Sequence, residues 1–187
     1  MVQTPIKPMT LAAFLELPET EPASEFINGK ITQKPMPKGK HSRLQTKLSS
    51  VLSDFLEAEK TGLALTKLRC SFGGAVVVLD VVVLQSSRIP RDGDGDIADM
   101  VEVAPDLTVE ILSPQQSQTR VIKKIFHCLT HGTQLGWLID PSEKTVLVFR
   151  RDQAIEILEA PTAQLPMPSV LSAFELTVET LFGWLQV

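Results

Sequence analysis

The sequence predicts an α/β fold in which a central mixed β-sheet is flanked by helices. Two apolar runs rich in β-branched residues, 75–84 and 105–113, have the length and composition of buried strands. Two other segments, 40–60 and 117–131, repeat apolar residues at helical spacing. Because helical and strand patterns alternate along the chain, we expect helices to pack on the faces of one sheet.

The composition indicates a globular protein. With 187 residues, 43% of them hydrophobic, the chain can bury one core, so we expect a single domain over residues 1–187. A net charge of -4 and a pI near 5.4 argue against a globally basic nucleic-acid binder, although a local patch can still bind phosphates. Cys70 and Cys128 lack metal-type spacing, which favours free, buried thiols in a reducing cytoplasm.

No targeting or membrane segment is expected. The first ten residues lack an apolar signal core, and the longest apolar run is far shorter than the ~20 residues that a membrane-spanning helix needs. We therefore expect a cytoplasmic protein that does not contact a membrane.

The N-terminal part predicts a short helix and a hairpin. Thr10 can cap the helix, which Pro18 ends. In segment 24–33, Asn28-Gly29 separates two short alternating runs, a strong hairpin signal. Glu25 lies on the first strand of that hairpin.

The following segment predicts a long helix and two strands. His41 lies in the first turn of helix 40–60, on the same face as its apolar residues, and therefore points inward. Gly62 is expected to end this helix. Strand 63–72 follows, and a turn at Gly73-Gly74 leads into strand 75–84, so the two strands are expected to pair antiparallel.

Acidic residues in loop 88–99 resemble the start of a calcium-binding loop. Asp92, Asp94 and Asp96 have the required spacing, but Ile97 stands where the turn glycine belongs and Val103 where the closing glutamate belongs. We interpret this loop as a solvated turn.

The C-terminal half predicts one helix against the sheet, further strands and a last helix. At 100° per residue, Lys124 lies at the border of the apolar stripe of helix 117–131, whereas Lys123 points to water. Gly132 is expected to close this helix. Strands are expected at 134–140 and 145–150, a third near 154–158, and a final helix within 176–185.

Two carboxylates interrupt the apolar strands. Asp80 lies in run 75–84 and Glu110 in run 105–113, and burying an ionised carboxylate costs several kcal/mol unless a cation or hydrogen-bond donors compensate. On neighbouring strands, the two can share a divalent metal ion. With Lys124 presented by the next helix, this set of residues is typical of magnesium-dependent phosphodiester hydrolysis.

Structural alternatives exist for four of the candidate residues, Asp80, Lys124, His41 and Glu25. Asp80 can instead pair with an arginine such as Arg69. Lys124 can extend along the helix to water, as lysines beside apolar stripes usually do. His41 can be a core histidine whose ring nitrogens are hydrogen-bonded and which has no catalytic role, and Glu25 can be a surface residue of the hairpin.

Several stretches together resemble the Uma-type putative restriction endonuclease family, a cyanobacteria-rich branch of the PD-(D/E)XK nuclease superfamily. The resemblance spans nearly the whole chain and is carried by TLAAFLELPET, EFINGKI, the helix that opens with His41, VVVLDVVVLQSSRIP, PDLTVEILSP and HGTQLGWLIDP. It implies a restriction-endonuclease-like α/β core.

The same resemblance implies roles for particular residues. Asp80 and Glu110 would be the metal-binding acids, Lys124 the helix-borne lysine, Glu25 the N-terminal glutamate and His41 the family histidine. The chain departs from the superfamily pattern in two places: Leu79 replaces the usual proline before Asp80, and Leu112 occupies the lysine position of the E-x-K motif. Activity would then depend on Lys124.

The hypothesis is a DNA endonuclease that uses Mg²⁺, with Mn²⁺ as an alternative ion. Asp80 and Glu110 hold the metal, Lys124 acts on the attacking water, Glu25 holds a metal-bound water, and His41 positions a phosphate or the glutamate. Cutting both strands favours a homodimer. Two alternatives stay open: a catalytically inactive module of the same fold that binds nucleic acid or a protein, and a metal-dependent hydrolase of another phosphate ester.

Overall fold

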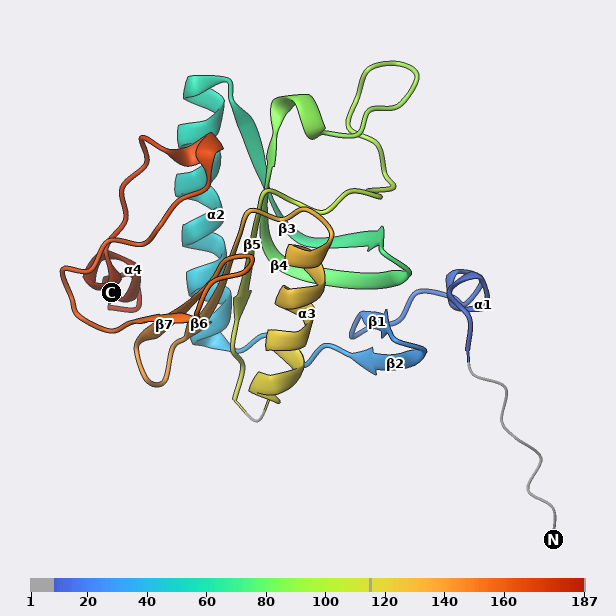
Figure 1. Ribbon diagram of the computed structural model, residues 1–187, viewed down its shortest axis with the longest axis horizontal. Helices are drawn as coiled ribbons and strands as arrows, with labels where there is room; N and C mark the ends of the chain where they lie inside the picture. Colours follow the sequence, from blue (N-terminus) through green and yellow to red (C-terminus); the bar gives the residue numbers. More distant parts are fainter. Residues whose placement is uncertain (1–8, 115, 187) are drawn as a thin grey trace, which may run out of the picture.

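The computed structural model describes residues 9–114 and 116–186 and contains one eight-stranded mixed sheet with helices on both faces (Figure 1). The prediction that the first ten residues form no signal segment falls mostly on residues 1–8, which lie outside the described part. The strands are β1 (Ser24–Ile27), β2 (Lys30–Gln33), β3 (Gly62–Phe72), β4 (Ala75–Gln85), β5 (Leu107–Ile111), β6 (Leu135–Asp140), β7 (Thr145–Phe149) and β8 (Glu156–Leu158). The helices are α1 (Leu11–Leu15), α2 (Gly39–Glu59), α3 (Gln118–Thr130) and α4 (Val178–Gly183), with short 3-10 helices at Ser86–Arg88 and Ser169–Leu171.

The strand order is β2-β1-β4-β5-β6-β7-β8, and β3 pairs with β4 outside this path. Strands β5 and β6 are parallel, and α3 connects them; the other pairs are antiparallel. The expected hairpin, the antiparallel β3–β4 pair and the mixed sheet are therefore confirmed. Val81 of β4 pairs with Val109 of β5, which makes the Asp80 and Glu110 strands neighbours.

The helices cover opposite faces of the sheet. Four fully buried leucines of α2 pack in one apolar cluster with α4 and with side chains of β4 to β7, whereas α3 packs against the other face (Figure 1). These leucines are Leu44, Leu48, Leu52 and Leu56. Within the described residues, no helix combines the length and apolar character needed to cross a membrane.

Close to Asp80, the alternation of side chains along β4 shifts from one face of the sheet to the other. Leu79 packs in a cluster with Cys128 of α3, whereas Val81 packs with the leucines of α2, although residues two apart in a regular strand share a face. In the paired strand, Lys67 adopts a left-handed backbone conformation with φ of 50°, between two residues that keep the regular register with β4. Figure 1 shows β3 and β4 bending together. The bend places the Asp80 carboxylate between the two faces.

Two expectations about the ends of helices were wrong in part. Helix α2 ends at Glu59, close to the expected end, but its left-handed C-cap is Lys60, with φ of 57°, and Gly62 is instead the first residue of β3. A Cβ atom at Gly62 would lie 2.4 Å from the carbonyl oxygen of Leu84, so the glycine allows β3 and β4 to approach. The last helix is only Val178–Gly183, because Thr177 caps its first turn and Leu176 is bonded to Leu165 in extended backbone.

The acidic loop is a turn, as expected. Arg91 and Ile97 form a bridge across it, and Arg91 donates to the carbonyl of Gly95. The carboxylates of Asp92, Asp94 and Asp96 are exposed. Across the described residues, no group of three metal-type side chains gathers there or elsewhere.

Cys70 and Cys128 are free and buried, as the sequence predicted. Burial raises the pKa of each thiol to about 12, because a thiolate in an apolar surrounding loses its hydration. At pH 8 we expect negligible reaction of the native protein with Ellman's reagent and release of two thionitrobenzoate equivalents after unfolding in guanidinium chloride. Rapid reaction of the native protein would contradict the buried placement of these thiols.

Candidate functional site

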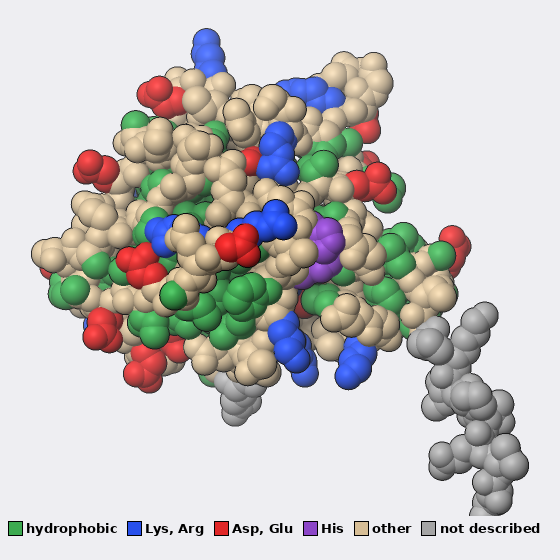
Figure 2. Space-filling model, viewed as in Figure 1, with side chains coloured by type: hydrophobic (Ala, Val, Ile, Leu, Met, Phe, Trp, Pro, Cys, Tyr) green, Lys and Arg blue, Asp and Glu red, His purple; other side chains and the backbone are tan. Residues whose placement is uncertain are grey.

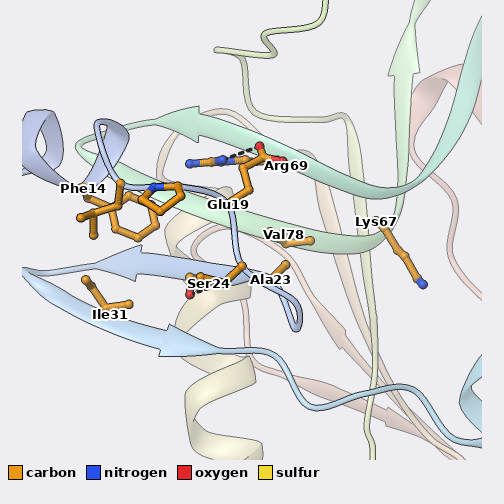
Figure 3. Close-up of a pocket in the computed structure, with 11 residues that line it drawn as sticks. Phe14, Glu19, Ala23, Ser24, Ile31, Lys67, Arg69 and Val78 are labelled. Atoms are coloured by element: carbon orange, nitrogen blue, oxygen red, sulfur yellow. Dashed lines mark hydrogen bonds and ion pairs between the residues drawn. The ribbon is translucent and has the colours of Figure 1, made fainter.

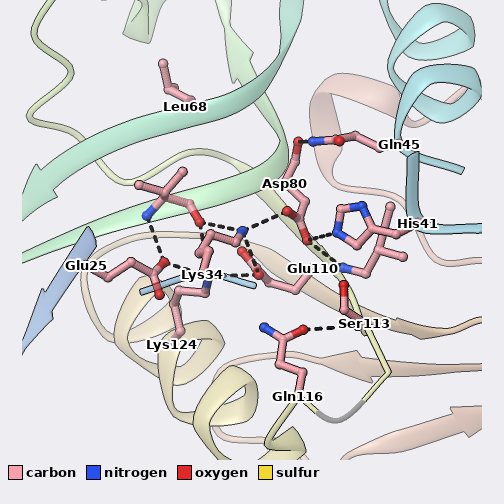
Figure 4. Close-up of polar contacts among 12 residues, drawn as sticks. Glu25, Lys34, His41, Gln45, Leu68, Asp80, Glu110, Ser113, Gln116 and Lys124 are labelled. Atoms are coloured by element: carbon pink, nitrogen blue, oxygen red, sulfur yellow. Dashed lines mark hydrogen bonds and ion pairs between the residues drawn. The ribbon is translucent and has the colours of Figure 1, made fainter. Parts of the chain in front are cut away.

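All five candidate residues belong to one buried polar cluster. Asp80, Glu110, Lys124, Glu25 and His41 expose between 1% and 6% of their surface. They come from β4, β5, α3, β1 and the first turn of α2, which converge where the sheet bends (Figure 4). A sixth residue, Lys34, which follows β2, joins them.

Asp80 is held by several donors at both carboxylate oxygens. Its Oδ1 accepts from Lys34 Nζ at 2.7 Å, and its Oδ2 accepts from the backbone N–H of Ile111 at 2.9 Å and from His41 Nε2 at 3.1 Å. Gln45 donates to the Asp80 carbonyl oxygen at 2.8 Å, so α2 fixes the backbone as well. The orientation of this carboxylate is therefore tightly constrained. Arg69, the arginine considered as its partner, instead pairs with Glu19 at 2.7 Å.

Glu110 lies in the middle of β5 and is almost completely buried. Its Oε2 is 2.8 Å from Lys124 Nζ and 3.3 Å from Lys34 Nζ. Its other oxygen, Oε1, is buried without a hydrogen-bond partner among the described residues. Because a buried carboxylate oxygen normally has a donor or a cation beside it, this atom is an unused acceptor to which a further ligand could bind.

Lys124 turns inward from α3 and connects two carboxylates. Its Nζ lies 2.8 Å from Oε1 of Glu25 and 2.8 Å from Glu110, and it donates to the carbonyl oxygen of Val78 at 3.0 Å. Glu25 also accepts from the Val78 backbone N–H at 2.9 Å. The alternatives in which Lys124 extends to water and Glu25 lies on the surface were therefore wrong. Lys123 is exposed, as expected.

His41 contacts the cluster from the first turn of α2. Its Nε2 donates to Asp80, while its Nδ1 is buried and unpaired among the described residues. Since an ionised carboxylate only accepts, the proton of a neutral His41 lies on Nε2. The contact shows that His41 orients Asp80.

Lys34 was missed by the sequence analysis. It lies among other lysines in a proline-containing stretch, where nothing local marks it as buried. The register of the hairpin could have predicted its position. Glu25 pairs directly with Thr32, and Lys34, two residues after Thr32, lies on the same face as Thr32. Extending the alternation past β2 would have placed Lys34 beside Glu25.

The charges of the cluster shift the pKa of its members in opposite ways. Burial disfavours the charged form of Asp80, but Lys34 and His41 outweigh it and hold the pKa of this carboxyl well below its usual range. Burial also raises the pKa of Glu110, and there Lys124 and Lys34 do not fully offset it. For Lys124, the surrounding carboxylates outweigh burial and raise its pKa. Asp80 and Lys124 are therefore charged at neutral pH.

Two small cavities open onto the cluster from either side of Lys34. One, of about 140 Å³, is lined by Lys34, His41, Asp80 and Lys67 together with the segment that follows β2. The other, of about 30 Å³, lies between Lys34 and Lys124 on the Glu25 side. Solvent-sized molecules can thus reach Asp80 through the larger cavity and Glu25 through the smaller one, and the exposed Lys67 lines the larger cavity.

A larger cavity of about 430 Å³ lies beside these openings, between α1, the hairpin and β3 (Figure 3). It shares Ala23, Lys67 and Val78 with the 140 Å³ cavity. Its wall includes Phe14 and the Arg69–Glu19 pair, and none of the cluster carboxylates lines it. It therefore adjoins the candidate site without containing its chemistry.

The surface carries mixed charge on the face that includes α3. Figure 2 shows Lys and Arg side chains scattered among Asp and Glu there, with hydrophobic side chains between them. This agrees with the net charge of -4. The visible face does not have the continuous basic stripe that non-specific binding of nucleic acid favours.

The donors of the cluster fit a divalent metal ion. Mg²⁺ prefers carboxylate oxygens and keeps several waters, so two protein ligands are sufficient. Asp80 and Glu110 offer such oxygens, Glu110 Oε1 lacks a partner among the described residues, and the ammonium of Lys34 already lies between the two carboxylates. In the part of the chain described, no third carboxylate, histidine or cysteine completes a protein-only set.

Comparison with known proteins gives a consistent result. Residues 11–179 match the model of the Uma2 family, described as "Putative restriction endonuclease". A crystal structure described as a putative nuclease belonging to DUF820, from Anabaena variabilis ATCC 29413, has a TM-score of 0.93 and 53% sequence identity over 95% of this chain and 99% of that chain. No curated protein matches the chain. The expected restriction-endonuclease-like α/β fold is confirmed.

Proposed function

Because this chain belongs to the Uma2 family of restriction-endonuclease-like proteins, we propose that it is a nuclease, and more specifically a Mg²⁺-dependent DNA endonuclease. The observation that carries the proposal is the convergence of Asp80 and Glu110 on one point with the buried ammonium of Lys124 2.8 Å from Glu110. Two carboxylates and a lysine in a site open to water have the residue types that metal-assisted phosphodiester hydrolysis requires.

The proposed division of roles follows from the contacts. Asp80 and Glu110 would hold Mg²⁺, or Mn²⁺, which when bound supplies a Lewis acid for the phosphate and lowers the pKa of water. Lys124 orients the attacking water and offsets the negative charge that develops on the phosphate. Glu25 fixes the ammonium of Lys124, and His41 fixes the carboxylate of Asp80. In this proposal Glu25 would also accept a hydrogen bond from a water held in the site.

The substrate would approach through the 140 Å³ opening. The exposed Lys67 lines this opening, between Thr66 and Leu68, which pair with Val81 and Leu79 of β4, and it can bind a phosphate of the DNA backbone. Cutting both strands of a duplex requires two such sites, which favours a homodimer.

The test is cleavage of supercoiled and linear DNA by the purified protein with MgCl₂, with MnCl₂ and with EDTA. We expect nicked and linear products only with a divalent ion, and loss of at least about a hundredfold in rate for Asp80→Asn, which removes a charged metal ligand. Asp96→Asn, an exposed aspartate in the loop, is the matched control and should cut like the wild type. Equal cleavage by wild type and Asp80→Asn would contradict the proposal.

Two observations favour the second candidate, an inactive module of the same fold that binds nucleic acid or a protein. Leu112 takes the lysine position of the superfamily motif, and Lys34 and Lys124 already pair with the carboxylates. In an inactive module these ion pairs would be purely structural. Isothermal titration with MnCl₂ separates the two candidates, because only the nuclease is expected to bind the ion in an Asp80-dependent manner.

A further inference from the structure

Lys34 occupies an unusual position for a lysine outside a helix or strand. Its side chain is only 12% exposed, and its Nζ lies 2.7 Å from Asp80 Oδ1, 3.3 Å from Glu110 Oε2 and 2.8 Å from the carbonyl oxygen of Val78. The ammonium therefore bridges the two carboxylates to which the metal is assigned, and all three of its contacts are to oxygen (Figure 4). Because Ile111 and His41 already occupy Asp80 Oδ2, a divalent ion held between the two carboxylates would need Asp80 Oδ1, the oxygen that Lys34 holds.

We propose that Lys34 is an internal counter-ion that closes the metal site in the absence of metal and must swing out before a divalent ion can bind between Asp80 and Glu110. This inference rests on the proposed function, because it assumes that these two carboxylates are the metal ligands. It adds a regulatory step to that function, since metal affinity depends on how often Lys34 leaves its bridging position.

The neighbourhood of Lys34 allows this movement. Its side chain lines both cavities that open onto the cluster, of about 140 Å³ and about 30 Å³, so there is open space next to it into which the ammonium can move. Its backbone is fixed by an N–H bond to the carbonyl of Ala23 at 3.0 Å, whereas the next residues include exposed Met36. A change of side-chain rotamer is therefore sufficient, and the hairpin need not move.

Lys124 does not share this freedom. Its side chain is only 3% exposed, its Nζ is held by Glu25, Glu110 and the carbonyl of Val78, and it borders only the smaller cavity of about 30 Å³. The two lysines thus differ in function: Lys124 is a fixed cation of the site, whereas Lys34 is the displaceable one. Only a displaceable cation competes with a metal ion for the carboxylates.

Chemical labelling of the wild-type protein tests the movement directly. Lysines are reductively methylated with formaldehyde and cyanoborohydride at increasing MnCl₂, and each site is quantified by peptide mass spectrometry. We expect labelling of Lys34 to rise at least about threefold on saturation with Mn²⁺, because the displaced ammonium becomes exposed. Exposed Lys30 of the same hairpin should label equally in both states, and Lys124 should stay protected.

Metal affinity tests the competition. Mn²⁺ binding is measured by isothermal titration for wild type, Lys34→Met and the matched control Lys30→Met, which removes the same charge from exposed β2. If the open state is about one tenth of the metal-free population, Lys34→Met binds Mn²⁺ about tenfold more tightly, while Lys30→Met stays within about twofold of wild type. Circular dichroism confirms that each variant is folded.

The outcomes separate the inference from the proposed function. Increased labelling of Lys34 with tighter binding by Lys34→Met supports the inference, and so does binding seen only in Lys34→Met. Asp80-dependent Mn²⁺ binding with unchanged labelling of Lys34 overturns the inference and leaves the nuclease proposal intact. Absence of Mn²⁺ binding in both wild type and Lys34→Met overturns both.

Discussion

Replacing Lys124 with methionine is expected to lower the rate of DNA cleavage by about 10²- to 10⁴-fold, the range for loss of a positioned charge or proton-transfer group in an active site. Methionine keeps the length and apolar contacts of the side chain but removes the ammonium between Glu25 and Glu110. The measurement is the single-turnover rate on supercoiled DNA at saturating Mg²⁺, so that a change in metal affinity does not affect the result.

The matched control for this variant is Lys123→Met, the adjacent residue on α3 that faces water. It should cut at the wild-type rate. Lys124→Arg keeps the charge and should retain more activity than Lys124→Met if the charge is the main contribution. Because Lys124→Met leaves two buried carboxylates with fewer cations, its melting temperature must be measured as well. A folded Lys124→Met protein that cuts normally would show that Lys124 is not part of the chemistry.

Replacing Asp106 with alanine is expected to destabilise the protein by about 3–5 kcal/mol, although it lies outside the candidate site. This carboxylate is fully buried and accepts from the backbone N–H of Gln85, from Arg88 and from Gln134. It joins the end of β4 to the starts of β5 and β6. Its removal leaves three donors without their acceptor, and each unsatisfied buried group costs about 1–3 kcal/mol.

Denaturant unfolding monitored by tryptophan fluorescence measures this effect. Asp99→Ala, an exposed aspartate in the preceding loop, should change stability by no more than about 0.5 kcal/mol. Arg88→Ala should cost less than Asp106→Ala, because the Arg88 side chain is 32% exposed and water can replace part of its role. If Asp106→Ala and Asp99→Ala unfold at the same denaturant concentration, the network at Asp106 does not contribute to stability.

The sequence could predict the residues whose environment is determined by local periodicity. Asp80 and Glu110 are conspicuous because each is a carboxylate in a run of β-branched residues, and such runs form buried strands wherever they pack. At 100° per residue, Lys124 was placed at the border of the apolar stripe, within reach of the sheet, and the alternative that it extends to water stayed open until the structure showed it buried. The order of helices and strands followed from the same periodic patterns.

Other features depend on contacts between distant segments. The bend of β3 and β4, with its left-handed residue at Lys67, has no signal in a continuous apolar run. The sequence predicted that Gly62 ends the helix. A glycine is needed there because the carbonyl oxygen of Leu84 lies too close for a Cβ atom. The final helix is short because the backbone of Leu176 bonds to Leu165, a contact that helical spacing cannot reveal.

The sequence by itself determined the fold class, the antiparallel β3–β4 pair, and that two carboxylates would be buried on core strands, because apolar periodicity and turn residues act locally. Only the tertiary structure decided that Glu25 is buried beside Lys124 and that Lys34 bridges Asp80 and Glu110. These contacts join residues 99, 46 and 76 positions apart. The distances between these atoms follow from how the hairpin packs against β4 and α3. Buried carboxylates need cations beside them, and Lys34 and Lys124 are the lysines that this packing brings within reach.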